Sequence, residues 1–180
     1  MDSLALAFSS GWASGVNAWL GVLVLGVAAR GGEVEEIPDV LGRWDVLTVA
    51  ATLFALEFVT DKIPYVDSTW DAVSTVVRPT AGAVVGVLLA GDADSLEQAV
   101  SGTVGGGTAL LSHAVKAGTR LAVNTSPEPA SNVLVSITED VAVLAVVWFA
   151  IEHPPAAAAI AAVLLATGLV LLYLLARGVR

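Results

Sequence analysis

Two carboxylate residues in the first half of the chain are placed to act together. Glu57 and Asp61 stand four residues apart in the segment LEFVTDK, and Lys62 follows directly. Residues four apart lie on the same face of a helix, so both carboxylates point the same way. Two like charges at this spacing need a proton or a cation between them. The pair therefore predicts a site that binds a small cation or a proton.

Two more acids follow in the same segment. Asp67 and Asp71 come after a proline, and Arg78 stands seven residues beyond Asp71 on the same helical face. Arg78 is therefore the natural counter-charge of Asp71. As a structural alternative, Ser68 and Asp71 fit a capping box at a helix start, and Asp67 is another candidate cap.

The second half of the chain carries its own polar set in NTSPEPASNVLVSITEDV. Glu128 stands in the first turn of an expected helix, and Asn132 and Glu139 share one face of that helix. Glu139 and Asp140 lie inside an otherwise apolar segment. Charges are costly in such a segment, so this pair predicts a functional site.

Two cations and one amide complete the set. Lys116 and Arg120 share one helical face of the preceding segment with His113, and on a structural interpretation the two cations only neutralise Glu139 and Asp140. Asn17 lies in the middle of the first apolar segment beside a glycine-containing stretch, where its side chain can add a neutral oxygen or satisfy the backbone.

The candidate residues are acidic in balance, with seven acids and four cations. The acids are Glu57, Asp61, Asp67, Asp71, Glu128, Glu139 and Asp140, and the cations are Lys62, Arg78, Lys116 and Arg120. Carboxylate oxygens suit protons, Mg²⁺, Ca²⁺ or Mn²⁺. If a metal binds, we expect Glu57, Asp61, Glu139 and Asp140 to hold it. No other cofactor is expected, because the chain has no cysteine and only two histidines.

Long apolar segments must position these residues. Of the 180 residues, 56% are hydrophobic and 14% are charged, whereas soluble domains average about 45–50% and about 25%. Six segments have the length needed to span a bilayer. They are Leu4 to Ala29, Trp44 to Lys62, Ser68 to Ala90, Leu96 to Val123, Ser131 to Ile151 and Ala156 to Ala176. The third contains Pro79 and is expected to be oblique or broken. We therefore expect an all-α integral membrane protein with one domain over residues 1–180.

An internal match indicates a duplication. A shift of 91 residues superimposes SGWASGVNAWL on SGTVGGGTALL, although chance or a shared need for close helix packing would also produce this match. A duplication gives repeats of about residues 1–91 and 92–180, and three spans in each would insert the second repeat upside down. Transporters of this kind bind substrate where helices are interrupted, here at Ser10 to Gly15 and Ser101 to Gly107.

Six spans place both termini on one side of the membrane. Six Lys and Arg residues then lie on one side and two on the other, so the positive-inside rule predicts that both termini are cytoplasmic. We expect a multi-pass protein of the inner or plasma membrane, with the lipid bilayer and a small ion or solute as partners. Gly82 and Gly86 share a helical face and leave a homo-oligomer open. The net charge of −9 argues against nucleic acid as a partner.

Three motifs carry a family resemblance. They are SGVNAWL, then DKIPYVDSTWD followed by VRPTAGA, and AVNTSPEPASN with its following ED. Over nearly its whole length the chain resembles the uncharacterised membrane family called domain of unknown function 4126, a resemblance that implies no particular activity. The three-plus-three plan is distantly similar to cation/proton exchangers with a Glu-x-Gly-Asp-Lys-Thr motif in each half. Here Glu57-Phe-Val-Thr-Asp61-Lys62 has one residue more, lacks the glycine and has no second copy.

The sequence predicts a small transporter for a cation, or for a small solute coupled to protons, with a carboxylate-lined site between the repeats. The alternative is a lipid-handling protein that binds or flips phosphate head groups through a basic pocket. That pocket would contain Lys62, Arg78, Lys116 and Arg120. A membrane enzyme or assembly factor is less favoured, and we expect no enzyme, because no nucleophile with its base, phosphate loop or HExxH motif is present.

Overall fold

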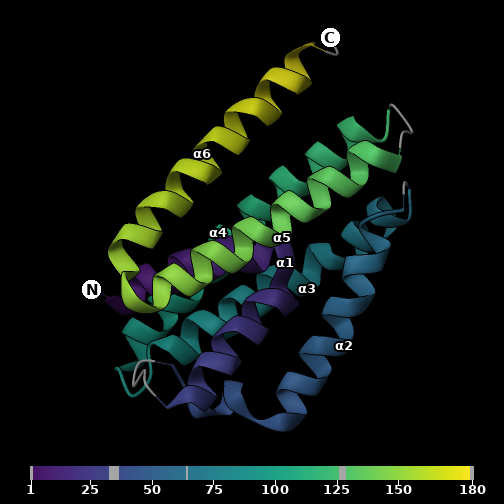
Figure 1. The fold of residues 1–180 in the computed structure, drawn as a ribbon. Helices are drawn as coiled ribbons and strands as arrows, with labels where there is room; N and C mark the ends of the chain where they lie inside the picture. The colour runs from purple at the N-terminus through teal and green to yellow at the C-terminus, as the bar shows by residue number, and fades with distance from the viewer. Residues whose placement is uncertain (1, 33–36, 64, 126–128, 179–180) are drawn as a thin grey trace.

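The computed structural model describes residues 2–32, 37–63, 65–125 and 129–178, and these ranges contain helices but no strand. Six α-helices follow one another, with a short 3-10 turn between the first two (Figure 1). They are α1 (Asp2–Gly31), α2 (Trp44–Thr60), α3 (Val66–Leu89), α4 (Ser95–Val123), α5 (Pro129–Glu152) and α6 (Pro154–Gly178), and the turn is η1 (Asp39–Gly42). The predicted all-helical fold is confirmed.

Four of these helices, α1, α3, α5 and α6, are long and apolar enough to cross a membrane. Helix α2 has only 17 residues, at the lower limit of the roughly 17–25 needed. Helix α4 is longer but carries Lys116 and Arg120. Large apolar side chains such as Trp148 and Leu171 are exposed on α5 and α6, as expected for surfaces that contact lipid. These features indicate a membrane protein.

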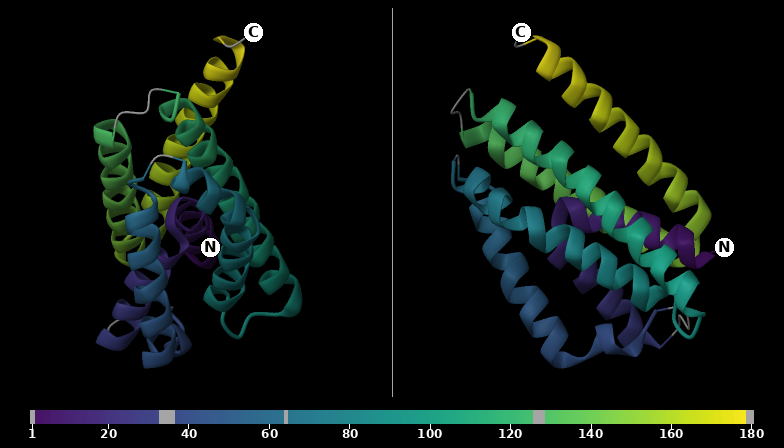
Figure 2. Two further views of the ribbon diagram at one scale, coloured as in Figure 1. Left: turned by 90° about the vertical axis from the view of Figure 1, so that its right-hand side faces the viewer. Right: turned by 180° about the vertical axis from the view of Figure 1, so that it is seen from behind.

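Helix α1 contains a break at Asn17, where φ is −151° and ψ is 96°. Figures 1 and 2 show that the two halves of α1 meet at an angle and fold back toward the same end of the bundle. Ser3, in the first turn of α1, and Pro38, a few residues after the end of α1, line one surface hollow together. Helix α1 therefore enters the bundle and returns, and it contacts all five other α-helices.

The Asn17 side chain stabilises this break. Its Oδ1 accepts a hydrogen bond from the backbone N–H of Leu20 at 3.0 Å, which makes Asn17 the cap of the second half of α1. In a continuous helix the N–H of Leu20 would donate to the carbonyl of Val16. The break thus frees the Val16 carbonyl for a partner outside α1.

The other helices run along the bundle. Gly168 and Leu172 of α6 meet Val115 and Gly118 of α4, so these two helices are parallel. The start of α1 is hydrogen-bonded to the first turn of α4. Residues 2 and 178 consequently lie at opposite ends of the bundle (Figure 1). The prediction of six membrane spans with both termini on one side treated α1 as a single crossing, whereas α1 folds back.

Glycines bring α1, α3 and α4 into close contact. A Cβ atom on Gly11 of α1 or Gly82 of α3 would collide with the backbone of Gly105 in α4. Gly86 lies equally close to the backbone of Ser101. Gly82 and Gly86 thus serve a contact within this chain, where the sequence left a contact between chains open.

The two stretches matched as a repeat, residues 10–20 and 101–111, pack against each other, because Gly11 meets Gly105 and Gly15 meets Ala109. This contact favours close helix packing as the reason for their similarity. The interruption predicted at Ser101 to Gly107 is wrong, because α4 is continuous there, and the break in α1 falls beyond the predicted stretch. Helix α3 is also continuous through Pro79, which membrane helices tolerate when neighbours satisfy the freed backbone groups.

The fold-back of α1 predicts which residues share a side of the membrane. Because the chain has no cysteine, Asp2→Cys, Gly32→Cys and Ala176→Cys can each be labelled alone with an impermeant maleimide in sealed vesicles of known orientation. We expect positions 2 and 32 to react from one side and position 176 from the other. Labelling of positions 2 and 176 from the same side would contradict the fold-back.

Candidate functional site

Eight charged side chains form one ionic cluster inside the bundle. Its members, here called the buried ionic cluster, are Glu57, Asp61, Asp67, Asp71, Arg78, Lys116, Arg120 and Glu139. Seven of these side chains expose at most 2% of their area, and Glu139 exposes 17%. They come from four helices, α2 with its C-terminal cap, α3, α4 and α5, so the fold brings together residues that are far apart in the sequence.

Arg78 occupies one end of the cluster. Its Nη2 donates to Glu57 Oε1 at 2.6 Å, and its Nη1 lies 3.0 Å from Asp71 Oδ1. The predicted pairing of Arg78 with Asp71 is confirmed. Asp71 belongs to the cluster, and within the described residues its carboxylate accepts no hydrogen bond from the N–H groups at the start of α3.

His113 packs behind Arg78 and was not among the predicted site residues. Arg78 Nη1 lies 2.8 Å from His113 Nδ1. Because arginine only donates, Nδ1 must accept this hydrogen bond. The neutral ring then carries its proton on Nε2 and donates it to Thr75 Oγ1 at 3.0 Å.

Lys116 lies at the centre of the cluster. Its Nζ donates to Asp61 Oδ2 at 2.5 Å, to the freed Val16 carbonyl at 2.9 Å and to Glu57 Oε1 at 3.4 Å. Glu139 Oε2 lies 3.8 Å away. Lys116 is thus the cation that the Glu57 and Asp61 pair needs, and it ties these acids to the break in α1.

Arg120 occupies the other end. It donates to Glu139 Oε2 at 2.6 Å and to the backbone carbonyl of Asp61 at 2.7 Å. Asp67 Oδ2 lies 3.9 Å away, and Asn132 lies within 3.4 Å. All three buried cations are therefore engaged by carboxylates and backbone carbonyls.

Asn124 extends the site beyond the predicted residues. Its Nδ2 donates to Asp67 Oδ1 and to Ser68 Oγ, each at 2.9 Å, and its Oδ1 accepts from Asn132 at 3.3 Å. A sequence signal for both missed residues exists, because His113, Lys116, Arg120 and Asn124 recur every three or four residues. Such spacing puts all four on one face of α4.

Three other predicted residues have different positions. Asn17 donates to Asp140 Oδ1 at 2.9 Å, so the break in α1 contacts α5 directly beside the cluster. Lys62 lies at the rim, where it bonds to Ser136 Oγ at 3.2 Å and covers the ring of Phe58. Glu128 lies outside the described residues, as does the predicted helix start around it.

The buried ionic cluster is not electrically balanced. Five carboxylates face three cations, which leaves two negative charges in excess if all groups are ionised. Within the described residues, five buried carboxylate oxygens of the cluster have no hydrogen-bond partner: Glu57 Oε2, Asp61 Oδ1, Asp67 Oδ2 and both oxygens of Asp71. Burying uncompensated charge is costly. The cluster therefore requires protons or an additional cation.

The predicted metal ligands do not meet as one set. Among the described residues, no three His, Cys, Asp or Glu side chains are grouped so that they could hold a metal ion. Lys116 lies between Glu57, Asp61 and Glu139, and Asp140 is bonded to Asn17 instead. A divalent site of the predicted composition is thus not assembled.

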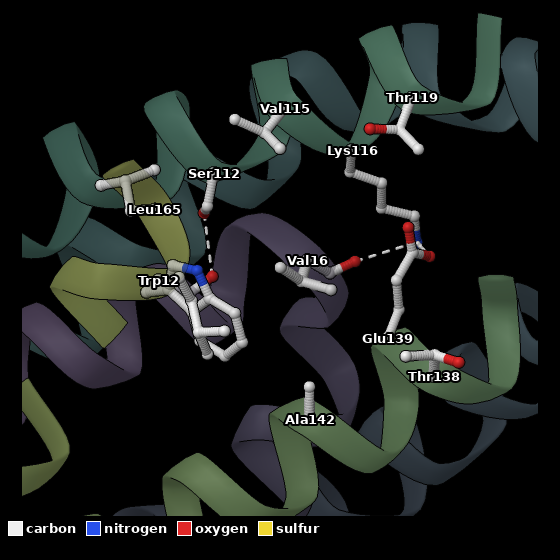
Figure 3. Close-up of a pocket in the computed structure, with 11 residues that line it drawn as sticks. Trp12, Val16, Ser112, Val115, Lys116, Thr119, Thr138, Glu139, Ala142 and Leu165 are labelled. Atoms are coloured by element: carbon white, nitrogen blue, oxygen red, sulfur yellow. Dashed lines mark hydrogen bonds and ion pairs between the residues drawn. The ribbon is translucent and has the colours of Figure 1, made fainter. Parts of the chain in front are cut away.

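A cavity of about 190 Å³ reaches the cluster between α1, α4, α5 and α6. Figure 3 shows Lys116 and Glu139 at one end of this cavity and Trp12 and Leu165 at the other. Glu139 is the cluster member with the largest exposed fraction, at 17%. The cavity therefore gives the cluster a route to its surroundings through Glu139.

The helical fold, the four membrane-length apolar helices and the internal ionic cluster are those of a helical membrane protein. The chain belongs to the family described as domain of unknown function (DUF4126), whose model matches residues 4–174. The family resemblance expected from the sequence is thereby confirmed. No curated protein and no solved structure matches this chain.

The pair of Arg120 and Glu139 provides a test of the cluster. We expect Arg120→Met to lower the free energy of unfolding by roughly 3–5 kcal/mol, because it leaves buried carboxylates without their partner. Adding Glu139→Met should recover a large part of this loss. Reversible unfolding in detergent would measure both, and a double variant that is as unstable as the sum of the single variants would contradict direct pairing.

Proposed function

We propose that this protein is a small membrane transporter that moves a cation, or a small solute coupled to protons, through the buried ionic cluster. The observation that carries the proposal is that five carboxylates face only three cations inside an apolar bundle. Protons or a cation relieve this excess, and an exchange of one for the other is coupled transport. We propose no enzymatic step.

Lys116 gives the cluster a means of responding to such an exchange. Its ammonium lies within 4 Å of Glu57, Asp61 and Glu139 at once. Neutralising Glu139 weakens one of these attractions and favours movement of the ammonium toward the other two carboxylates. Because Lys116 also holds the Val16 carbonyl, this shift is transmitted to the break in α1.

The broken helix α1 is the element that we expect to move. Its tip is fixed by the contact between Asn17 and Asp140 and by the bond from Lys116 to Val16. Broken helices whose ends meet the bound ion are a recurrent feature of transporters. Loss or gain of a charge at these two contacts would shift the tip and change access to the cluster.

We propose a multi-pass arrangement in the cell membrane in which α2 to α6 cross and α1 is re-entrant. Two observations support an inversion of the second repeat relative to the first. The second helices of the two repeats, α2 and α5, run in opposite directions, and so do the third helices, α3 and α6. The positive-inside count loses its weight, since Arg78, Lys116 and Arg120 are buried in ion pairs. The prediction that both termini are cytoplasmic is therefore not retained.

The lipid-handling alternative is less favoured by the same geometry. A phosphate head group needs free donors from lysine or arginine. The three donors of Lys116 are all engaged, and Arg78 and Arg120 are 0–1% exposed. Lys62 alone among the four predicted head-group cations is partly accessible.

Flux in liposomes tests the proposal. We would reconstitute the purified protein, impose a proton gradient and follow proton and cation movement with enclosed dyes. Glu57→Gln and Glu139→Gln should each reduce flux by at least about tenfold, since each removes a charge that the exchange requires. Thermal unfolding of each variant would show whether it remains folded.

Glu152→Gln is the matched control, because Glu152 lies on α5 with Glu139 but is exposed at the helix end. It should retain the flux of the unchanged protein. Absence of flux in the unchanged protein over a panel of monovalent and divalent cations would contradict the proposal. Equal flux in all variants would assign the cluster a structural role only.

A further inference from the structure

We infer that the transported solute is a small organic cation with an apolar body, which occupies the cavity between α1, α4, α5 and α6 with its charge at Glu139. This inference rests on the proposed function and specifies the class of substrate. It follows from the charge, the size and the opening of the cavity.

The sign of the charge follows from which groups in the cavity are free. Lys116 reaches the cavity, but its three donors are engaged by Val16, Glu57 and Asp61. Glu139 binds Arg120 through Oε2 only, and its Oε1 makes no hydrogen bond to the described residues. The cavity therefore offers a carboxylate oxygen backed by a cluster with excess negative charge. Such an end attracts a cation and repels an anion.

The apolar end fixes the character of the rest of the solute. Trp12 and Leu165 line this end, and Figure 3 shows Val16 and Val115 between it and Lys116. An indole face binds organic cations and aromatic rings alike. A hydrated metal ion would leave these side chains uncovered, so a solute with its own apolar body fits better.

The size of the cavity limits that body. An engineered apolar cavity of about 150 Å³ holds one benzene molecule, and pockets for drug-sized ligands exceed about 300 Å³. At about 190 Å³, the cavity is matched to one ring or a branched aliphatic group with a small charged head.

The opening of the cavity indicates the route of entry. Thr138 of α5 and Leu164 of α6 line it and are exposed on the surface of the bundle. Both helices are long and apolar enough to span a membrane, and Figure 1 shows α6 diverging from α5 toward the C-terminus. The opening thus faces the bilayer, where amphipathic cations concentrate.

Binding of benzyltrimethylammonium to the protein in nanodiscs tests the inference. Its uncharged carbon analogue, neopentylbenzene, is the ligand control, and empty nanodiscs correct for partition into lipid. We expect saturable binding of the cation by calorimetry and at least about tenfold weaker binding of the analogue, because the charge contact is lost. Equal binding of both, or no binding of the cation, would overturn the inference.

Three variants locate the site. Glu139→Gln should weaken binding about tenfold and Trp12→Leu roughly threefold or more. Ala142→Phe fills the cavity without changing a charge and should abolish binding. This variant tests the site independently if Glu139→Gln alters folding. Trp148→Leu, at a side chain 58% exposed outside the cavity, should leave binding unchanged. Unchanged binding in Ala142→Phe would overturn the assignment.

The two proposals fail in distinguishable ways. Binding of benzyltrimethylammonium without any proton-coupled flux would retain this site and contradict transport. Proton or cation flux in the unchanged protein, together with no binding of benzyltrimethylammonium, would retain the transporter and contradict the organic cation as its substrate.

Discussion

The ammonium of Lys116 connects the parts of this protein that define its site. It is 2.5 Å from Asp61 at the end of α2 and 2.9 Å from the carbonyl of Val16 at the break in α1. That carbonyl is free because Asn17 caps the second half of α1 and takes the N–H of Leu20. A buried ammonium needs both carboxylates and carbonyls around it. Helix α1 consequently breaks at the point where Lys116 needs a carbonyl acceptor. The fold of α1 and the buried ionic cluster therefore depend on each other.

The imbalance of charge distinguishes this cluster from a network that only holds helices together. A purely structural network is most stable when its charges cancel and its polar atoms are paired. Here five carboxylates face three cations, and carboxylate oxygens remain without hydrogen bonds. The cavity brings Glu139, and no other acid of the cluster, to its surroundings. The excess charge and the access route meet at one side chain, which is what exchange of protons for a cation needs.

The sequence was sufficient to predict the acidic residues, their basic partners and the helical fold, because periodicity places side chains on faces and apolar length identifies spans. The pairing of Asp71 with Arg78 is an example. It was not sufficient to predict the path of α1. Asn17 breaks that helix by capping its second half, but in the sequence a capping asparagine cannot be told apart from a single polar residue within a continuous span. The positive-inside count loses its weight for a related reason: it treats Arg78 and Arg120 as charges near loops, although both are buried. His113 was placed on the shared face of α4 but given no role, and Asn124 was missed because a single asparagine at the end of a segment is unremarkable alone.

We propose that the buried ionic cluster carries protons that a cation can displace. Infrared difference spectroscopy of the protein in nanodiscs measures this directly, because protonated carboxylic acids absorb apart from carboxylates and amides. We expect a signal from buried protonated carboxyl groups at neutral pH that diminishes when benzyltrimethylammonium is added and changes in Glu139→Gln. Absence of any protonated carboxyl signal at neutral pH, with no change on adding the cation, would contradict the proposal.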